Sequence, residues 1–178
     1  EKAAASKLPH SDNLVNLVVI DQLRDVLEQG LTLAEVLRVL APQGVAWIGE
    51  SATSGKAPLS LKEMRGILKT SKLASVRIVE RNGIWARLEK PRPKNIDTWT
   101  HFRHGPNGNP VSQDQVIQVP SGVQWMAGPQ WPTGHRKQAV PTVVVSEKRL
   151  IYVFQDEVNN SGKATKQDSL IVRDAFNG

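Results

Sequence analysis

Residues 142–178 carry the pattern that most constrains the fold of this chain. Two β-rich stretches flank a polar turn at 146–149, and a third apolar stretch begins at Leu170, so the sequence predicts an antiparallel meander of about three strands. The third stretch runs into the turn Asp174-Ala-Phe-Asn-Gly178, after which we expect a further strand. A meander of this kind suits an all-β fold that closes only by radial repetition of about 4–8 such units. We therefore expect the chain to be a piece of a longer protein.

The composition is that of a globular protein. The chain has 178 residues, 39% of them hydrophobic, which is enough for one ordinary domain or two small or partial ones. No apolar run approaches the length of a membrane-spanning helix, and residues 1–7 lack the apolar core of a secretory signal. The absence of cysteine excludes disulfides, thiol nucleophiles and cysteine metal sites, but it leaves the compartment open.

The net charge of +6 is concentrated in one segment. Residues 60–94 hold ten Lys and Arg against three Glu, a local charge of +7. Such a stripe is typical of a nucleic-acid or acidic-partner surface, and equally of a solvated helix face beside an edge hairpin. Aromatic residues are not interleaved with these charges in the sequence as a single-strand stacking groove requires, so we do not expect a nucleic-acid partner.

The first ninety residues alternate strands with helices. A near-continuous apolar run at 14–20 predicts a buried strand, and helices are predicted at 22–29 and 33–40, the second opened by a capping box at Thr32 and Glu35. A short strand at 45–48 and a helix from Ser60 to about Thr70 follow. Asn82-Gly83 then predicts a hairpin between strands at 74–80 and 84–89. Residues 1–90 are therefore predicted to be an α/β domain with an antiparallel edge.

Two segments of this domain resemble a known family. The strand Asn16-Leu-Val-Val-Ile-Asp21 and the turn Arg38-Val-Leu-Ala-Pro-Gln-Gly44 resemble the later half of class I S-adenosylmethionine-dependent methyltransferases, in which an Arg-x-Leu-x-Pro-Gly-Gly turn leads into the fifth strand. Pro42 and Gly44 match this motif, and Gln43 replaces its first glycine. The resemblance covers residues 12–90 and implies a Rossmann-like half-sheet in which strands four, five, seven and six are neighbours.

The same resemblance bears on the cofactor and on one acidic residue. The glycine-rich loop that admits S-adenosylmethionine and the acid that holds its ribose both belong upstream of residue 12 in that fold, so we expect no cofactor to bind to this chain alone. The edge of strand four is then expected to lie open. Asp21 stands where the family often places a residue of the substrate end of the site, which makes it the candidate catalytic residue. The alternative is that Asp21 only ends the strand or caps the following helix.

Residues 91–95 are predicted to be a stiff linker, because prolines 91 and 93 break any regular element, and residues 96–178 form the second predicted domain. His101 and His104, with Asp97 and His135 nearby in sequence, are weak metal-ligand candidates. The glycines and proline around them argue against a helix that would bring the histidines together, so we predict no metal site. Hydrogen bonds from the imidazoles to irregular backbone are the alternative.

Residues 95–178 resemble the beginning of a pyrroloquinoline-quinone-type β-propeller. The residues that match the family's lead-in segment are Trp99, Phe102, Arg103, His104, Asn109, Gln124 and Trp125. Arg173-Asp174-Ala-Phe-Asn-Gly178 matches its blade turn, which in the family joins the third and fourth strands of a blade while a later Trp docks across blades. We expect the tryptophans at 99, 125 and 131 to pack within or between blades. The predicted fold class is thus a partial α/β methyltransferase-like sheet followed by an incomplete all-β propeller blade.

The combined order resembles large multidomain bacterial proteins with quinoprotein-like propellers. The leading hypothesis is a fragment that binds or scaffolds, with the remaining domains of the parent as partners and self-association through open sheet edges. The alternatives are a methyltransferase, a quinone-dependent dehydrogenase and a basic nucleic-acid binder that uses residues 60–94. S-adenosylmethionine or pyrroloquinoline quinone would be cofactors of the parent. The propeller resemblance slightly favours the periplasm or cell envelope.

Overall fold

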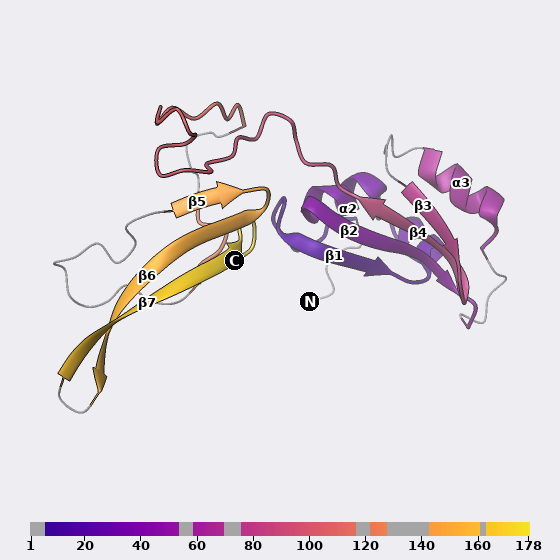
Figure 1. The fold of residues 1–178 in the computed structure, drawn as a ribbon. Helices are drawn as coiled ribbons and strands as arrows, with labels where there is room; N and C mark the ends of the chain where they lie inside the picture. The colour runs from indigo at the N-terminus through magenta and orange to yellow at the C-terminus, as the bar shows by residue number, and fades with distance from the viewer. Residues whose placement is uncertain (1–5, 54–58, 70–75, 117–121, 128–142, 161–162) are drawn as a thin grey trace. The chain divides into compact units, whose positions relative to one another are not determined.

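The structure is a computed structural model of residues 1–178, and it describes residues 6–53, 59–69, 76–116, 122–127, 143–160 and 163–178. Contacts between Cα atoms divide the chain into unit 1, Glu1–Arg92, and unit 2, Pro93–Gly178 (Figure 1). The dividing point falls inside the segment 91–95 that the sequence predicts to be a linker. The assignment of the two segments as domains of a larger protein stays a prediction.

Unit 1 is built on a four-stranded mixed sheet, here called sheet A, with the strand order β1-β2-β4-β3. Strand β1 (Val15–Ile20) pairs in parallel with β2 (Leu40–Ser51). Strand β4 (Gly83–Glu89) pairs antiparallel with β2 on one side and with β3 (Val76–Glu80) on the other. The predicted hairpin is confirmed, since β3 and β4 pair on either side of Asn82-Gly83, and the φ angles of these two residues, 49° and 124°, are both positive.

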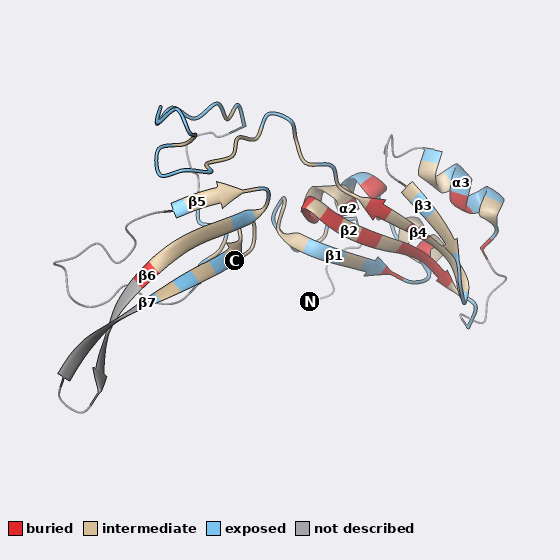
Figure 2. Ribbon diagram, viewed as in Figure 1, coloured by how far each residue is buried: buried red, intermediate tan, exposed pale blue. Residues whose placement is uncertain are grey.

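Three helices cover one face of sheet A. They are α1 (Leu23–Glu28), α2 (Leu33–Val39) and α3 (Leu61–Lys69), each close to its predicted position. One buried side chain from each helix, Leu23, Val36 and Met64, joins the core that lies on the sheet face of Ala46, Ile48, Ala86 and Leu88 (Figure 2). None of the helices in the described ranges is long and apolar enough to cross a membrane.

The two predicted capping boxes differ in the structure. At α3 both halves form, because the Ser60 Oγ accepts from the Glu63 backbone N–H at 3.2 Å and the Glu63 carboxylate accepts from the Ser60 N–H at 2.8 Å. At α2 the Thr32 Oγ1 accepts from the Glu35 N–H at 3.2 Å. The Glu35 carboxylate instead accepts from the Leu8 N–H at 2.8 Å and from Arg38, so it ties α2 to the N-terminal segment.

Strand β2 begins five residues before the predicted start, because α2 passes into it without a loop. Gln43 takes the left-handed conformation, φ 63°, at the position where the methyltransferase motif has glycine. The next residue, Gly44, has no room for a side chain, since a Cβ there would lie 2.7 Å from the Ala41 carbonyl oxygen. Pro42 is fully buried. The Pro-Gln-Gly turn is therefore a tightly packed bulge inside β2.

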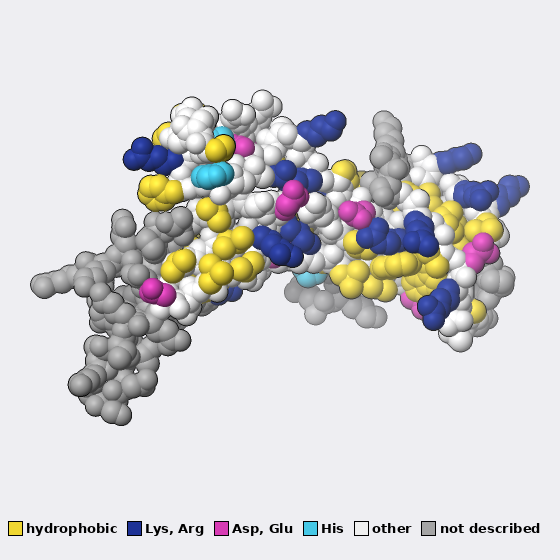
Figure 3. All heavy atoms as spheres, viewed as in Figure 1, with side chains coloured by type: hydrophobic (Ala, Val, Ile, Leu, Met, Phe, Trp, Pro, Cys, Tyr) yellow, Lys and Arg dark blue, Asp and Glu magenta, His cyan; other side chains and the backbone are white. Residues whose placement is uncertain are grey.

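The face of sheet A opposite the helices is partly open, and its β1 edge is apolar. The strand register places Leu17, Val19, Val45, Trp47 and Trp85 on the face opposite the helices. Leu17 is 57% exposed and Val19 61% exposed, and β1 contains no charged residue. Figure 3 shows hydrophobic side chains gathered over sheet A. The opposite edge strand, β3, carries Arg77 and Glu80, charges that discourage pairing with another strand.

Unit 2 contains a three-stranded antiparallel meander, sheet B, with the order β5-β6-β7. Strand β5 (Val143–Ser146) pairs with β6 (Arg149–Asn160), which pairs along its whole length with β7 (Lys163–Asp174). The predicted meander is confirmed, although β6 and β7 extend further than the apolar pattern indicates. Sheet B is an open sheet, and the described residues form no closed propeller.

Candidate functional site

The carboxyl ends of the parallel strands β1 and β2 meet at Asp21 and Ser51. The Asp21 Oδ1 accepts from the backbone N–H of Ser51 at 2.9 Å and of Gln22 at 2.8 Å, and its Oδ2 accepts from the Ser51 Oγ at 2.9 Å. The Ser51 N–H in particular lowers the pKa of the Asp21 carboxyl. Ligands of open α/β sheets bind outside the carboxyl ends of the strands, so Asp21 stands at a position suited to a ligand while it fastens the two strands together.

The residue after Asp21 has an uncommon backbone conformation. Gln22 is left-handed, φ 57°, and caps the N-terminus of α1 without a side-chain hydrogen bond. Left-handed conformations of residues other than glycine, asparagine and aspartate are sparsely populated and occur often at functional sites. The turn from β1 into α1 is thus a second feature, beside Asp21, that marks this end of sheet A.

A buried ion pair lies next to this turn. The Glu50 side chain, only 4% exposed, accepts from the Arg24 Nε at 2.8 Å and from its Nη2 at 2.6 Å. These bonds from Arg24 hold the pKa of Glu50 below its usual range against the opposing effect of burial. Sequence analysis missed this pair, because its members are 26 positions apart and no spacing links them. The pair fixes α1 against the end of β2.

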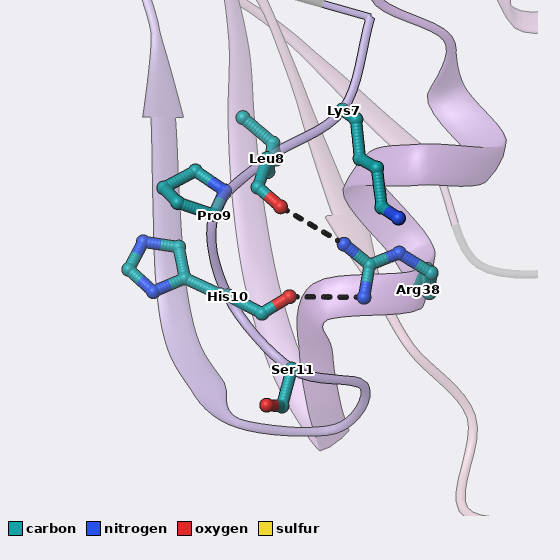
Figure 4. Close-up of a pocket in the computed structure, with 6 residues that line it drawn as sticks. All are labelled: Lys7, Leu8, Pro9, His10, Ser11 and Arg38. Carbon is teal, nitrogen blue, oxygen red and sulfur yellow. Dashed lines mark hydrogen bonds between the residues drawn. The ribbon is translucent and has the colours of Figure 1, made fainter. Parts of the chain in front are cut away.

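A second cluster of charges fastens the N-terminal segment to α2. Arg38 donates to the carbonyl oxygens of Leu8 at 3.2 Å and His10 at 2.9 Å, and it pairs with Asp12 at 2.6 Å (Figure 4). It also donates to both carboxylate oxygens of Glu35. The Arg38 bonds lower the pKa of Glu35 to about 2. A cavity of about 310 Å³ opens beside this cluster, lined by Lys7, Leu8, Pro9, His10, Ser11 and Arg38. The Arg38 guanidinium at the centre of this cluster donates to acceptors of the protein itself, which indicates a structural role for the cluster.

In unit 2, Asp97 organises the segment that precedes sheet B. Its Oδ2 accepts from the backbone N–H of Gln113 at 2.6 Å and from the Ser112 Oγ at 3.1 Å, and lies 2.7 Å from the His104 Nε2. The Gln113 N–H, followed by other bonds, lowers the pKa of Asp97 to about 2. His104 has φ 66° and its ring meets Trp99 edge-on at 5.1 Å. In the sequence, only the short spacing of Asp97 and His104 indicates that these two side chains meet.

The structure does not bring the two histidines together as metal ligands. His104 is bonded to Asp97, whereas the exposed His101 has its Nδ1 2.9 Å from the Thr100 Oγ1. The two residues face each other only through a backbone bridge, in a segment without a helix. Within the described ranges no three His, Asp or Glu side chains are grouped so that they could hold a metal ion. His135 and Trp131 lie outside these ranges.

The Asp174–Gly178 turn has the tight geometry that its sequence predicts. The Asp174 Oδ1 accepts from the Phe176 N–H at 2.9 Å, and the Gly178 N–H donates to the Asp174 carbonyl oxygen at 3.0 Å. The Trp125 indole lies over Gly178, φ 81°, where a Cβ would be 3.0 Å from the ring. Its Nε1 donates to the Ala175 carbonyl oxygen at 3.4 Å. Trp125 therefore packs against this turn.

Five cations of the basic stripe, residues 60–94, lie on two surfaces, three on α3 and two on sheet A. Lys62, Arg65 and Lys69 lie along α3. Arg77 and Arg87 lie opposite each other on the open face of sheet A, and the register brings them beside Trp47 and Trp85. In the folded sheet these two cations therefore lie beside aromatic side chains, a proximity that depends on strand register. The expectation that no nucleic acid binds stays a prediction. Arg87 is paired with Glu89 at 2.9 Å.

Comparisons with known proteins give one match. No protein family matches the chain. No curated protein matches it either. A solved structure from Methanococcus maripaludis, described as a provisional S-adenosyl-L-methionine-dependent methyltransferase, is similar with 15% sequence identity and a TM-score of 0.42. The match covers 53% of this chain and 55% of that one, so it spans about half the length of the methyltransferase-like neighbour.

Proposed function

We propose that the chain joins the later half of a class I methyltransferase-like domain to the first blade of a quinoprotein-like β-propeller that acts in binding or scaffolding. The observation that carries the first part is the strand order β1-β2-β4-β3, in which only the β1–β2 pair is parallel. This is the order that the resemblance implies for strands four, five, seven and six. The bulge at Gln43 and Gly44 lies where the family's glycine turn is expected.

The open β1 edge supports the same proposal. Parallel strands are usually covered on both faces, whereas β1, which pairs in parallel with β2, exposes Leu17 and Val19 on the face opposite the helices. An uncharged apolar edge strand is a site for pairing with another strand. In the proposed parent protein, strands of the first half of the methyltransferase-like domain pair with β1, and helices of that half cover this face.

Sheet B supports the second part of the proposal. A propeller blade is a four-stranded antiparallel meander, and β5, β6 and β7 supply three such strands in consecutive order. The Asp174–Gly178 turn follows the third strand, and Trp125 packs on it. In this arrangement the turn leads to the fourth strand of the blade, and the neighbouring blades of the parent protein complete the propeller.

The residues of this chain do not supply a complete site for S-adenosylmethionine. Its sequence contains no Gly-x-Gly loop, and the ribose-holding acid of the family is expected before residue 12. Calorimetric titration of the chain with S-adenosylmethionine tests the proposal. We expect no heat of binding, because the sequence has no glycine-rich loop of the kind through which the family admits the cofactor. Micromolar binding would contradict the proposal.

A methyltransferase is the second candidate, and the position of Asp21 favours it. Asp21 is held in one orientation at the carboxyl end of β1, where a substrate of this fold would lie. If the chain does bind S-adenosylmethionine, Asp21→Asn should weaken the binding or abolish methyl transfer, while Asp12→Asn, at the other end of β1, should change neither. If the chain does not bind S-adenosylmethionine, the titration gives no support to this second candidate.

A further inference from the structure

Unit 2 contains a cavity of about 440 Å³ that lies beside β5. This volume is within the range of about 300–1,000 Å³ that is typical of small-molecule sites. Its apolar wall is formed by side chains from three separate segments, Trp99, Val143, Val145 and Phe176. A cavity that collects apolar side chains from distant parts of the chain offers a binding surface that no single segment has.

The wall of this cavity is fixed by backbone hydrogen bonds. Trp99 and Val145 exchange two of them, with N···O distances of 2.9 and 2.7 Å, so the segment before sheet B runs beside β5 as a short extra strand. The Trp99 Nε1 donates to the Phe102 carbonyl oxygen at 3.4 Å, and the edge of His104 meets the ring. The Ala175 N–H donates to the Lys148 carbonyl oxygen at 2.7 Å, which holds the turn that carries Phe176.

The polar side chains that line the cavity are acidic or neutral. The acidic ones are Asp97, Asp114 and Glu147, and the described lining contains no Lys or Arg. Asp114 accepts from the backbone N–H groups of Asp97 at 3.2 Å and of Val116 at 2.7 Å, which sets its orientation. Carboxylates near an aromatic wall favour a positive charge, because the ring face attracts cations as well.

We propose that this cavity binds an organic cation, an ammonium group on an alkyl or aryl body. The apolar body lies against Trp99, Val145 and Phe176. The ammonium group faces the lining carboxylates, here called the rim: Asp97, Asp114 and Glu147. The sign of the lining charge selects a cation over an anion, and the apolar wall selects an organic cation over a metal ion. The inference concerns unit 2 alone, so it does not depend on how sheet A is completed.

Calorimetric titration of the full chain tests this site with three probes of similar body and different charge: benzyltrimethylammonium, benzyl alcohol and benzenesulfonate. We expect the cation to bind at least about tenfold more tightly than the neutral and anionic probes, with an affinity that falls as salt is raised. Equal affinity for the three probes, or no binding of the cation up to about 10 mM, would overturn the proposal.

Variants locate the site. Glu147→Gln removes one rim charge without a change of shape and should weaken binding of benzyltrimethylammonium by about three- to tenfold. Glu80→Gln, the same change on the exposed end of β3, is the matched control and should leave the affinity unchanged. Trp99→Leu should abolish binding, with circular dichroism to check that sheet B persists. Unchanged affinity in Glu147→Gln would place the cation elsewhere and refute this assignment.

Discussion

The ammonium group of Lys90 lies 2.7 Å from the carbonyl oxygen of Leu40, the residue at which α2 passes into β2. It also lies 2.7 Å from the Asn13 Oδ1, at the start of the segment that leads into β1. Burial lowers the pKa of Lys90. The last residue before the proline-rich segment 91–95 is thus tied to the segment before β1 and to the junction of α2 with β2, and we infer that it holds these parts together.

Removal of this cation tests the inference. Lys90→Met keeps the length of the side chain but removes its bonds to the Leu40 and Asn13 oxygens, so unit 1 should lose about 1–3 kcal/mol of unfolding free energy in chemical denaturation. Lys94→Met, at an exposed position four residues later, is the control and should change stability by less than about 0.5 kcal/mol. Equal effects of the two variants would show that the Lys90 bonds carry no stability.

Substitutions at the two residues of the Gln43-Gly44 bulge should have opposite effects on stability. Gly44→Ala should destabilise unit 1 by about 1–3 kcal/mol, because the new Cβ would lie 2.7 Å from the Ala41 carbonyl oxygen and 3.0 Å from that of Val15. Gln43→Gly should be neutral or stabilising by up to about 1 kcal/mol, because glycine adopts positive φ without strain. Thermal unfolding of both variants measures the difference, and a destabilised Gln43→Gly protein would argue against strain at this position.

The packing of Trp125 on Gly178 should contribute to the stability of unit 2. We expect Trp125→Leu to lower the unfolding free energy by about 1–3 kcal/mol, since the ring covers the Asp174–Gly178 turn. Trp125→Phe keeps a ring over Gly178 but removes the 3.4 Å bond to the Ala175 carbonyl oxygen, so it should cost less. If the leucine and phenylalanine variants are equally stable, the ring contact is not what holds the turn.

Acid should release the segment that Asp97 organises. The pKa of Asp97 is lowered from 3.8 to about 2 in the folded state, so its contribution to stability is present above about pH 4 and is lost as the pH falls towards 2. Asp97→Asn should remove this part of the acid dependence and lower stability at neutral pH. Denaturation at a series of pH values checks both effects. An unchanged pH profile in Asp97→Asn would assign the acid sensitivity to other carboxylates.

The elements of unit 1 could be predicted because their signals are local. The Asn82-Gly83 turn, the Ser60 capping box and the strand β1 each depend on residues a few positions apart, and the structure has all three. The prediction that β1 is buried was wrong, because no helix in the described ranges covers the face on which Leu17 and Val19 lie exposed. The early start of β2 could not be predicted from such signals. Pro42 marked the end of a helix, while its burial inside a bulge depends on the packing of Gly44 against β1.

The contacts of the candidate site depend on strand register and helix packing, so they could not be predicted from the sequence. Arg24 meets Glu50 only because α1 packs beside the end of β2, and Trp47 meets Arg87 only because these strands pair as they do. The role of Asp21 stays a prediction, because its bonds to Ser51 suit a structural clamp and a ligand site alike. Asp97 and His104 were noted as neighbours in sequence, but not as a bonded pair.

The most direct test of the account is whether the β1 edge of sheet A pairs with further strands. Sedimentation velocity over a range of concentrations should show association of the chain, and Val19→Lys should suppress it by placing a charge on the 61% exposed edge position. Glu80→Gln makes the same change of net charge on the β3 edge and should not suppress the association. A chain that stays monomeric at every concentration, or association that Val19→Lys leaves intact, would contradict the claim that β1 is an open joining edge.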